Sequence, residues 1–426
     1  MCAPFRRTVS PEGGRLMPAA SIVNGCTGSL KLASRSDFDQ WREIIALGID
    51  QSDSRLVARQ TIGRHLHCVE LWMPGNCNLH CRHCYVASRP PKAVLREEEY
   101  YALTVKLISE GLVDVVIPGM EPLLRQELWT VLDAARDANA RTVGITTNGT
   151  LLAGYAKRLD ASSLTVLNVS LDGPQRTHDA IRGRGVFHRI EEGVRAFRRV
   201  SSKRLITNTT VHRENLGELT SVASIGRDWG VDYSAFHPFE FAAEAENSLA
   251  ATAAEVVEGY IRLIEDFRKG YTGSIVLEAE ASTLEVIVGL VNSGALDDCR
   301  LVLDEAGFYF LHQVIDEREM LVSLMFYPHH FVRTIRVADD GGLSSCRSMA
   351  RTGWEGVGDL RRDSLQALLG TEKVVGALAL IWDEFRDAQR PLETDSLLKL
   401  CDFLASRTEI LTENDLETTV AVLSPT

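Results

Sequence analysis

The segment GNCNLHCRHCY holds three cysteines, Cys77, Cys81 and Cys84, in the spacing Cx3Cx2C. Structural zinc takes four ligands, and a neighbouring histidine, His80 or His83, offers the fourth. A cubane iron–sulfur cluster takes one cysteine per iron, so three cysteines leave one iron open to a ligand from outside the protein. The spacing favours the cluster, and zinc is the alternative.

The elements that must position these cysteines form a series of short β-rich runs and helix-length amphipathic runs, which begins at about residue 66. Mostly apolar strands that alternate with helices favour a parallel sheet, and such sheets bind ligands at the carboxyl ends of their strands. Six units are too few for an eight-stranded barrel, so we expect an α/β fold with a partial (β/α)6 barrel. The strands are expected at residues 67–73, 113–119, 141–148, 164–172, 204–211 and 231–238.

Composition narrows the classes of protein. The chain has 426 residues, of which 45% are hydrophobic, so it can bury a large core. A formal charge of -12 argues against a nucleic-acid partner. No run of eighteen apolar residues and no secretory signal are present, so we expect a cytoplasmic protein without a membrane partner. A reducing compartment would keep the nine cysteines available as metal ligands.

The motif CNLHCRHCY closely resembles the signature of the radical S-adenosylmethionine (SAM) superfamily, and the resemblance covers about residues 66 to 240. It implies a [4Fe-4S] cluster on Cys77, Cys81 and Cys84, whose open iron is chelated by the amino and carboxylate groups of SAM. In this family a reduced cluster cleaves SAM to a 5′-deoxyadenosyl radical, which abstracts hydrogen from the substrate. The electron would come from a donor such as flavodoxin or ferredoxin.

Further motifs that resemble those of the superfamily follow successive strands. IPGMEPLL places Gly119, Met120 and Glu121 in the three positions of the GGE motif, whose carbonyls and carboxylate would meet the SAM ammonium. Met120 replaces the second glycine, and a carbonyl contact tolerates a side chain there if φ is negative. TTNGT offers Thr147 and Asn148 near the methionyl end of SAM.

Two more matches complete the expected site. VSLDGP places Ser170 and Asp172 near the ribose or the substrate. HDAIRGRG resembles the peptide-modifying branch with SPASM or twitch extensions, and in it Arg182 is the candidate for the SAM carboxylate, which a guanidinium binds bidentately. Tyr85 matches the aromatic position against the adenine, where the backbone carries the hydrogen bond. Each motif alone is also an ordinary turn or helix-start sequence, but their order after successive strands favours the site.

The C-terminal part retains only some features of a SPASM or twitch extension. Gly341 and Cys346 keep the Gx4C spacing in the expected hairpin TIRVADDGGLSSC, but the window for the earlier cysteine holds FYPHH. We therefore expect a degenerate SPASM-like α+β domain without an auxiliary cluster. The alternative is an unusual ligand set made of Cys299, Cys346 and either His329 or His330.

The sequence thus predicts an N-terminal extension of unknown role at residues 1–65, a radical SAM core at 66–245 and the degenerate domain at 246–426. Without an auxiliary cluster to accept an electron, redox-neutral rearrangement, elimination or epimerisation is favoured over oxidation. Cys346 would then be either a hydrogen donor or a former ligand packed in the hairpin.

The expected function is hydrogen abstraction from a peptide or a secondary metabolite, in peptide or natural-product maturation. The alternative is a zinc-stabilised binding protein that has kept the fold. Glu121, Asn148 and Arg182 argue against it, because a structural zinc would not need them.

Overall fold

The structure of the chain is a computed structural model. It describes residues 30–34, 37–39, 42–43, 53–73, 77–84, 95–239, 247–278, 284–304, 308–324, 332–338, 340–344, 356–389 and 394–407. Within these ranges we find no helix that is both long enough and apolar enough to cross a membrane.

All six strands expected for the core are present, within a few residues of their expected ends. Their residues are mostly buried on both faces, as in a parallel sheet that is covered on both sides. Each runs parallel to the next along the chain, and helices cross between them. The strands are β2 Cys68–Leu71, β3 Asp114–Ile117, β4 Thr142–Thr147, β5 Val166–Ser170, β6 Arg204–Val211 and β7 Tyr233–Pro238.

The remaining strands extend the same sheet beyond both of its edges. In the described residues the sheet has 13 strands in the order β1-β9-β10-β11-β8-β7-β6-β5-β4-β3-β2-β12-β13. No described pairing joins its two ends, so the barrel is partial, which confirms the expected fold class. The added strands are β1 Lys31–Leu32, β8 Ile275–Glu278, β9 Arg300–Leu303, β10 Tyr309–Ile315, β11 Arg318–Ser323, β12 Thr334–Val337 and β13 Leu343–Ser344.

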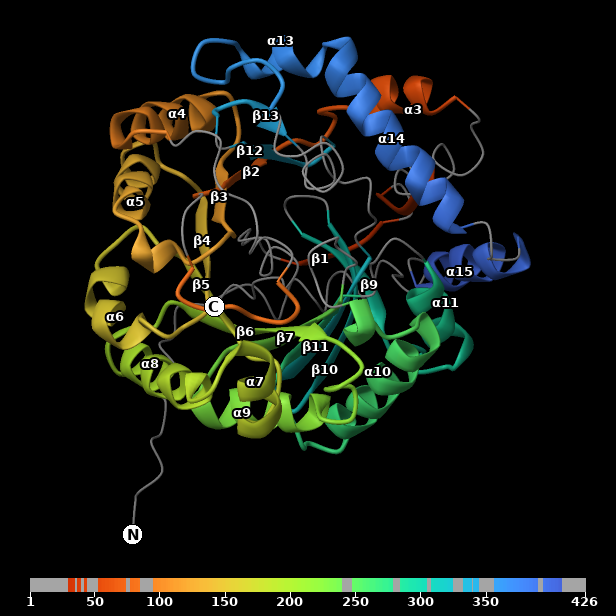
Figure 1. Cartoon of the computed structure of the whole chain (residues 1–426). Coiled ribbons are helices and arrows are strands. Elements are labelled where there is room, and N and C mark those ends of the chain that lie inside the picture. The colour runs from red at the N-terminus through yellow and green to blue at the C-terminus, as the bar shows by residue number, and fades with distance from the viewer. Residues whose placement is uncertain are drawn as a thin grey trace, which may run out of the picture.

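Helices surround the strands on the outside of this curved sheet (Figure 1). Local signals define several of them: Thr252 and Glu255 form a capping box at the start of α10, and Gly230 ends α9 in a left-handed conformation. The core helices are α4 Glu97–Ser109, α5 Glu127–Asp137, α6 Leu152–Asp160, α7 Gln175–Arg182, α8 Val186–Val200, α9 Leu219–Trp229, α10 Ala253–Arg268 and α11 Glu285–Asn292, with the 3-10 turns η1 Pro122–Leu124 and η2 Asn247–Leu249.

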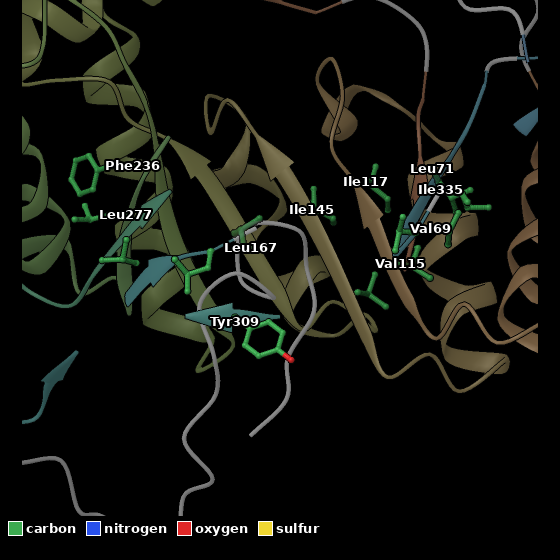
Figure 2. Packing of buried hydrophobic residues seen from close by; sticks show 14 of the residues in the cluster. Val69, Leu71, Val115, Ile117, Ile145, Leu167, Phe236, Leu277, Tyr309 and Ile335 are labelled. Atoms are coloured by element: carbon green, nitrogen blue, oxygen red, sulfur yellow. The ribbon is translucent and has the colours of Figure 1, made fainter. Parts of the chain in front are cut away.

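The two faces of the sheet belong to different hydrophobic clusters. Leu167 and Val169 of β5 belong to the large cluster that includes the helices, whereas Val166 between β4 and β6 belongs to a smaller cluster with Ile206 and Ala235. Because side chains alternate along a strand, the second set faces the inside of the barrel. Figure 2 shows the large cluster continuing from strand to strand through side chains such as Val69, Val115 and Ile145.

The C-terminal half is joined to the core by its edge strands. β12 and β13 form the hairpin expected around the DDGG turn, and β12 runs parallel to β2. The sheet therefore continues across residue 245, and the domain division expected there stays a prediction.

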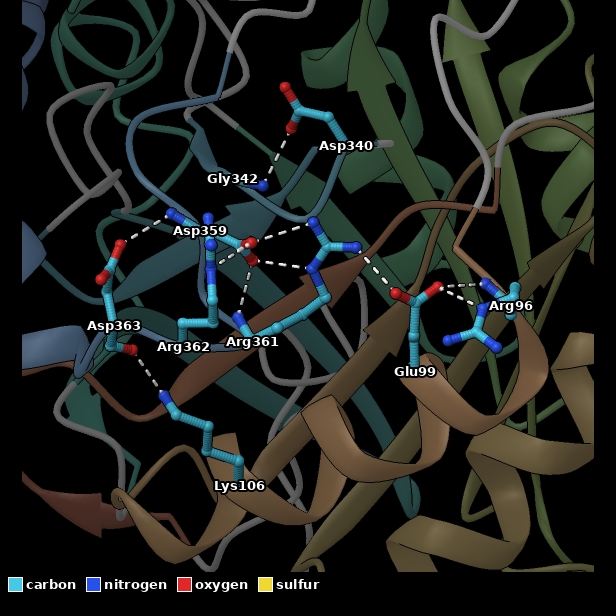
Figure 3. A network of polar contacts seen from close by, with 9 residues as sticks. All are labelled: Arg96, Glu99, Lys106, Asp340, Gly342, Asp359, Arg361, Arg362 and Asp363. Carbon is cyan, nitrogen blue, oxygen red and sulfur yellow. Dashed lines mark hydrogen bonds and ion pairs between the residues drawn. The ribbon is translucent and has the colours of Figure 1, made fainter.

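Polar contacts attach the segment after this hairpin to α4. The guanidinium of Arg361 donates to Asp359 in its own segment and to Glu99 of α4. Lys106 of α4 donates to the carbonyl oxygen of Asp363 at 2.8 Å (Figure 3). The helices that follow are α13 Leu365–Leu369, α14 Glu372–Gln389 and α15 Thr394–Ser406, and α14 lies against α3 Ser54–Thr61 of the N-terminal part.

Candidate functional site

The three cysteines lie on the segment that follows β2, and each thiol is partly buried. The amide of Cys84 donates to the carbonyl of Cys81 at 3.1 Å, which forms a tight turn. The amide of Arg82 donates to the carbonyl of Ile181 at 3.1 Å, so the turn is held against α7. Burial raises the pKa of the Cys77 thiol, and it raises that of Cys81 to about 11.

Asn148, directly after β4, connects this segment to the next motif. Its side-chain Nδ2 donates to Oδ1 of Asn78 at 2.8 Å and lies 3.6 Å from Sγ of Cys77. Its Oδ1 accepts from the amide of Thr150 at 3.0 Å, so the carboxamide is oriented from both ends. An amide N–H thus points at the sulfur of one expected iron ligand.

Glu121 is fully buried, and its carboxylate accepts three hydrogen bonds from neutral donors. Oε1 accepts from Oγ1 of Thr147 at 2.7 Å and from the amide of Leu123 at 3.0 Å, and Oε2 accepts from the amide of Asn148 at 2.8 Å. Burial raises the pKa of Glu121 although these hydrogen bonds oppose the rise. A carboxylate offers about four lone-pair positions, so one on Oε2 is left for a further donor.

The two residues before Glu121 explain the GME sequence. A Cβ at Gly119 would lie 2.3 Å from Cε3 of Trp72, so glycine is required there by the indole ring. Met120 has a φ of 52°, and the condition of a negative φ is therefore not met. The backbone keeps the left-handed conformation that suits the family's second glycine, and methionine adopts it at a strain of about 1 kcal/mol.

Asp172 and Arg182 form a buried ion pair close enough to Cys81 for both charges to act on its thiol. Nε of Arg182 donates to Oδ2 of Asp172 at 2.5 Å, and the amide of Thr210 donates to Oδ1 at 3.1 Å. Burial alone would raise the pKa of Asp172, but the charge and the hydrogen bond of Arg182 outweigh it and hold that pKa well below its usual range. The expected bidentate partner of Arg182 is the SAM carboxylate, whereas in this structure its Nε already serves Asp172.

Four histidines lie around this ion pair, of which the sequence had indicated His83 alone, as a possible zinc ligand. The Nδ1 atom of His83 is 3.8 Å from Oδ2 of Asp172, and Nδ1 of His178 accepts from the Asp172 amide at 3.1 Å. His212 follows β6 with its ring centroid 6.4 Å from that of His83, and Nε2 of His237 lies 3.4 Å from Oγ1 of Thr210. Burial lowers the pKa of all four, to about 3 for His83 and about 4 for His178. His212 and His237 lie at strand ends, and this position is the signal from which the sequence could have indicated them.

The other expected residues divide by position. Ser170 ends β5 and is 8% exposed, next to Asn208 in the sheet register. Tyr85, Cys346, His329 and His330 lie outside the described residues. Cys299 is 3% exposed inside the large hydrophobic cluster, where burial raises its pKa to about 12.

The donor set fits a cubane cluster. Each of the three thiols would bind a different iron, and the Asn148 amide would donate to a cluster-bound sulfur, which is one of the contacts that tune such clusters. In the described part of the chain, no three His, Cys, Asp or Glu side chains are already gathered as ligands of a metal ion.

Comparison with curated proteins finds relatives of several activities. The chain is 34% identical over 172 residues to the AdoMet-dependent heme synthase of Methanosarcina barkeri (strain Fusaro / DSM 804), over 39% of this chain and 48% of that protein. It is 29% identical over 166 residues to the GTP 3′,8-cyclase of Peptoclostridium acidaminophilum, over 37% of this chain and 51% of the relative. The chain thus spans about half the length of these two relatives.

The comparisons of fold and family agree with the cysteine motif. The structure of Streptococcus suis SuiB bound to S-adenosylmethionine superposes with a TM-score of 0.57 at 12% identity, over 74% of this chain and 68% of SuiB, a likeness of fold. Residues 73–224 match the family described as the Radical SAM superfamily. The two expected cofactors are those of this superfamily, a [4Fe-4S] cluster and SAM. Residues 73–224 of the chain therefore form a radical SAM domain.

Proposed function

We propose that the protein is a radical SAM enzyme that removes a hydrogen atom from a peptide substrate. When bound and reduced, the cluster supplies the electron that splits SAM into methionine and a 5′-deoxyadenosyl radical, and this radical becomes 5′-deoxyadenosine by taking the hydrogen. The protein's own residues bind and orient the reactants and exclude water from the radical.

One observation carries the proposal: Asn148 joins the cysteine segment to the GME motif. It contacts Sγ of Cys77 with its side chain and Oε2 of Glu121 with its backbone amide. Three separate strand ends therefore meet where the cluster and the methionyl end of SAM would lie. A zinc-stabilised binding protein would need the cysteines, but not a buried carboxylate beside them.

The residues take distinct roles in this proposal. Cys77, Cys81 and Cys84 hold the cluster, and Oε2 of Glu121 accepts the ammonium of SAM. Arg182 binds the SAM carboxylate through its terminal nitrogens while Asp172 holds its Nε. Thr147 orients Glu121, Ser170 is assigned to the ribose or the substrate, and the resemblance of the cysteine motif assigns Tyr85 to the adenine.

The substrate class is supported by the similarity to SuiB, which has also been solved bound to its precursor peptide SuiA, with a TM-score of 0.57 at 13% identity. A nucleotide is the second candidate, because the relatives include a GTP 3′,8-cyclase. In both cases flavodoxin or ferredoxin would supply the electron. We propose a redox-neutral fate for the substrate radical, with Cys346 as a candidate hydrogen donor.

The test is anaerobic purification followed by iron analysis and an assay for 5′-deoxyadenosine. We expect about four iron per chain, and loss of the iron when Cys77, Cys81 or Cys84 is replaced by Ala. Cys299→Ala is the matched control, because this cysteine is buried in the core and should leave the iron in place. Stoichiometric zinc without iron uptake would reject the cluster, and about eight iron would reveal an auxiliary cluster.

The same preparation distinguishes the substrates. Candidate peptides encoded by neighbouring genes and GTP are each incubated with SAM and a reductant, and the products are examined by mass spectrometry. Turnover of a peptide supports the proposal, whereas turnover of GTP alone replaces it with the nucleotide reaction.

A further inference from the structure

The inner face of the sheet carries a charged pair where the C-terminal hairpin joins the core. In the parallel register of β12 with β2, Arg336 stands directly opposite Glu70. Cys68 and Glu70 alternate with Val69 and Leu71, which belong to the outer cluster, so Glu70 points to the inside of the barrel. Arg336 of β12 therefore lies next to β2, the strand that leads to the cysteines.

This pair is almost completely buried. Glu70 is 6% exposed and Arg336 is 4% exposed, and Nε of Arg336 donates to Oε2 of Glu70 at 2.6 Å. Desolvating two charges offsets most of their attraction, and a well-packed apolar pair in the same place is often as stable. Stability alone therefore does not account for an arginine at this position.

Arg336 has a second partner in Trp72. The guanidinium carbon lies 4.4 Å from the centre of an indole ring that is 1% exposed. A planar guanidinium stacks on an aromatic face in a way that a lysine ammonium does not reproduce. The carbonyl of Trp72 also accepts a hydrogen bond from the hydroxyl of Tyr100 at 2.9 Å, so both ends of this residue are fixed.

Trp72 in turn sets the path of the segment that carries Glu121. Its ring occupies the space in which a side chain of Gly119 would begin, only 2.3 Å from the ideal Cβ position. Two residues later, the carboxylate of Glu121 binds Thr147 and Asn148. The contacts therefore lead from Arg336 to Trp72 and from Trp72 to Gly119, and Glu121 follows Gly119 by two residues in the chain.

We propose that Arg336 is a positioning residue for SAM: it presses Trp72 against Gly119 and so fixes the carboxylate of Glu121. The inference rests on the proposed function, since it assigns SAM binding to the GME segment. It gives the C-terminal hairpin a role in cofactor binding that depends on no auxiliary cluster.

The experiment compares Arg336→Lys with the parent, as the full chain with its cluster reconstituted anaerobically. Lysine keeps a positive charge beside Glu70 but loses the planar stacking on Trp72. We expect the iron content to be unchanged. The affinity for SAM should fall about tenfold, as measured by equilibrium dialysis with labelled SAM. Trp72→Phe keeps an aromatic face and should weaken SAM binding less than Trp72→Leu.

Two further variants separate positioning from general loss of stability. The double variant Glu70→Gln with Arg336→Met leaves no unpaired charge and serves if Arg336→Lys folds poorly. Arg141→Lys is the matched control, because Arg141 pairs with Asp114 at the amino end of β3, with Nε to Oδ1 at 2.9 Å. It should lower the melting temperature and leave the SAM affinity unchanged.

The outcomes are distinct. If the parent binds SAM and the Arg336 variants bind it equally well, the positioning role is wrong and the proposed function stands. If the parent itself binds no SAM, the proposed function fails and takes this inference with it. Weakening that is matched by Arg141→Lys would reduce Arg336 to a stabilising residue and also overturn the proposal.

Discussion

Glu121 and Asp172 are two fully buried carboxylates that follow β3 and β5, the strands on either side of β4, and the chain treats their charges in opposite ways. Glu121 is held by three neutral donors, and its burial raises its pKa. Asp172 is held by the guanidinium of Arg182, and its pKa lies well below the usual range despite complete burial.

The difference between the two carboxylates separates a structural role, that of Asp172, from a ligand-binding role, that of Glu121. The charge of Asp172 is cancelled inside the protein, so Asp172 holds the position of Arg182 and of the strand end. The hydrogen bonds to Glu121 orient its charge without cancelling it, and a cationic ligand would complete the neutralisation. Loss of the Asp172 carboxylate should therefore affect the fold, whereas loss of the Glu121 charge, or replacement of the Arg182 guanidinium by another cation, should affect the ligand.

The largest expected effect is that of Asp172→Asn. The change leaves Arg182 buried without its counter-charge, so the free energy of unfolding should fall by about 3–5 kcal/mol, as measured by urea denaturation. Asp232→Asn is the control, because its partner Arg198 forms a more exposed pair and the loss should be about 1 kcal/mol or less. Equal losses in the two variants would remove the distinction between the carboxylates.

The second prediction concerns acid sensitivity on the Asp172 side. Burial lowers the pKa of His178 to about 4, from an ordinary value of about 6.5. Between these pH values the unfolded chain takes up a proton that the folded chain refuses, so stability falls as the pH drops from about 6.5 to about 4, by on the order of 3 kcal/mol from this histidine.

His178→Asn should flatten this fall, because the Asn Oδ1 can accept the hydrogen bond from the Asp172 amide without titrating. His188→Asn is the control at an exposed position and should leave the profile unchanged. The measurement is the melting temperature across this pH range, and an unaltered slope for His178→Asn would contradict the assignment.

The third prediction addresses Glu121 and Arg182, the two residues proposed to bind SAM. Glu121→Gln should keep the iron and weaken SAM binding by about 2 kcal/mol, or roughly thirtyfold, because the charge that meets the ammonium is lost. Arg182→Lys should weaken SAM binding to a similar extent. Affinities equal to that of the parent would show that these two positions do not bind SAM.

The smallest expected effect is that of Met120→Gly. Glycine adopts a positive φ without strain, so the variant should gain up to about 1 kcal/mol at this position, less the greater flexibility of glycine in the unfolded chain. Met120→Ala keeps the strain and is the control. If glycine proves less stable than alanine, the left-handed conformation at this position is wrong.

Local pattern was sufficient for much of the fold. The six core strands and the β12–β13 hairpin follow from apolar runs and a DDGG turn, which act over a few residues. The position of β12 beside β2 depends on a pairing between segments far apart in the chain, and neither segment alone contains a signal for it.

The site was predictable as a set of residues but not as a set of partners. The order of motifs after the strands indicated Cys77, Glu121 and Asn148, which the structure brings together. The pairing of Asp172 with Arg182, the four histidines and the stacking of Arg336 on Trp72 arise from barrel geometry. A sequence shows which groups lie at strand ends but not which of them face one another.

The pairing of β2 with β12 also has a consequence for biosynthesis. Glu70 and its partner Arg336 are 266 residues apart, so at a translation rate of about 5–20 residues per second the ribosome needs on the order of tens of seconds between them. During that time one edge of β2 has no strand to pair with, and an exposed apolar edge invites association with other chains. The strand that leads into the cysteine motif is thus among the last to be enclosed, and chaperone supply during expression should govern the yield of soluble protein.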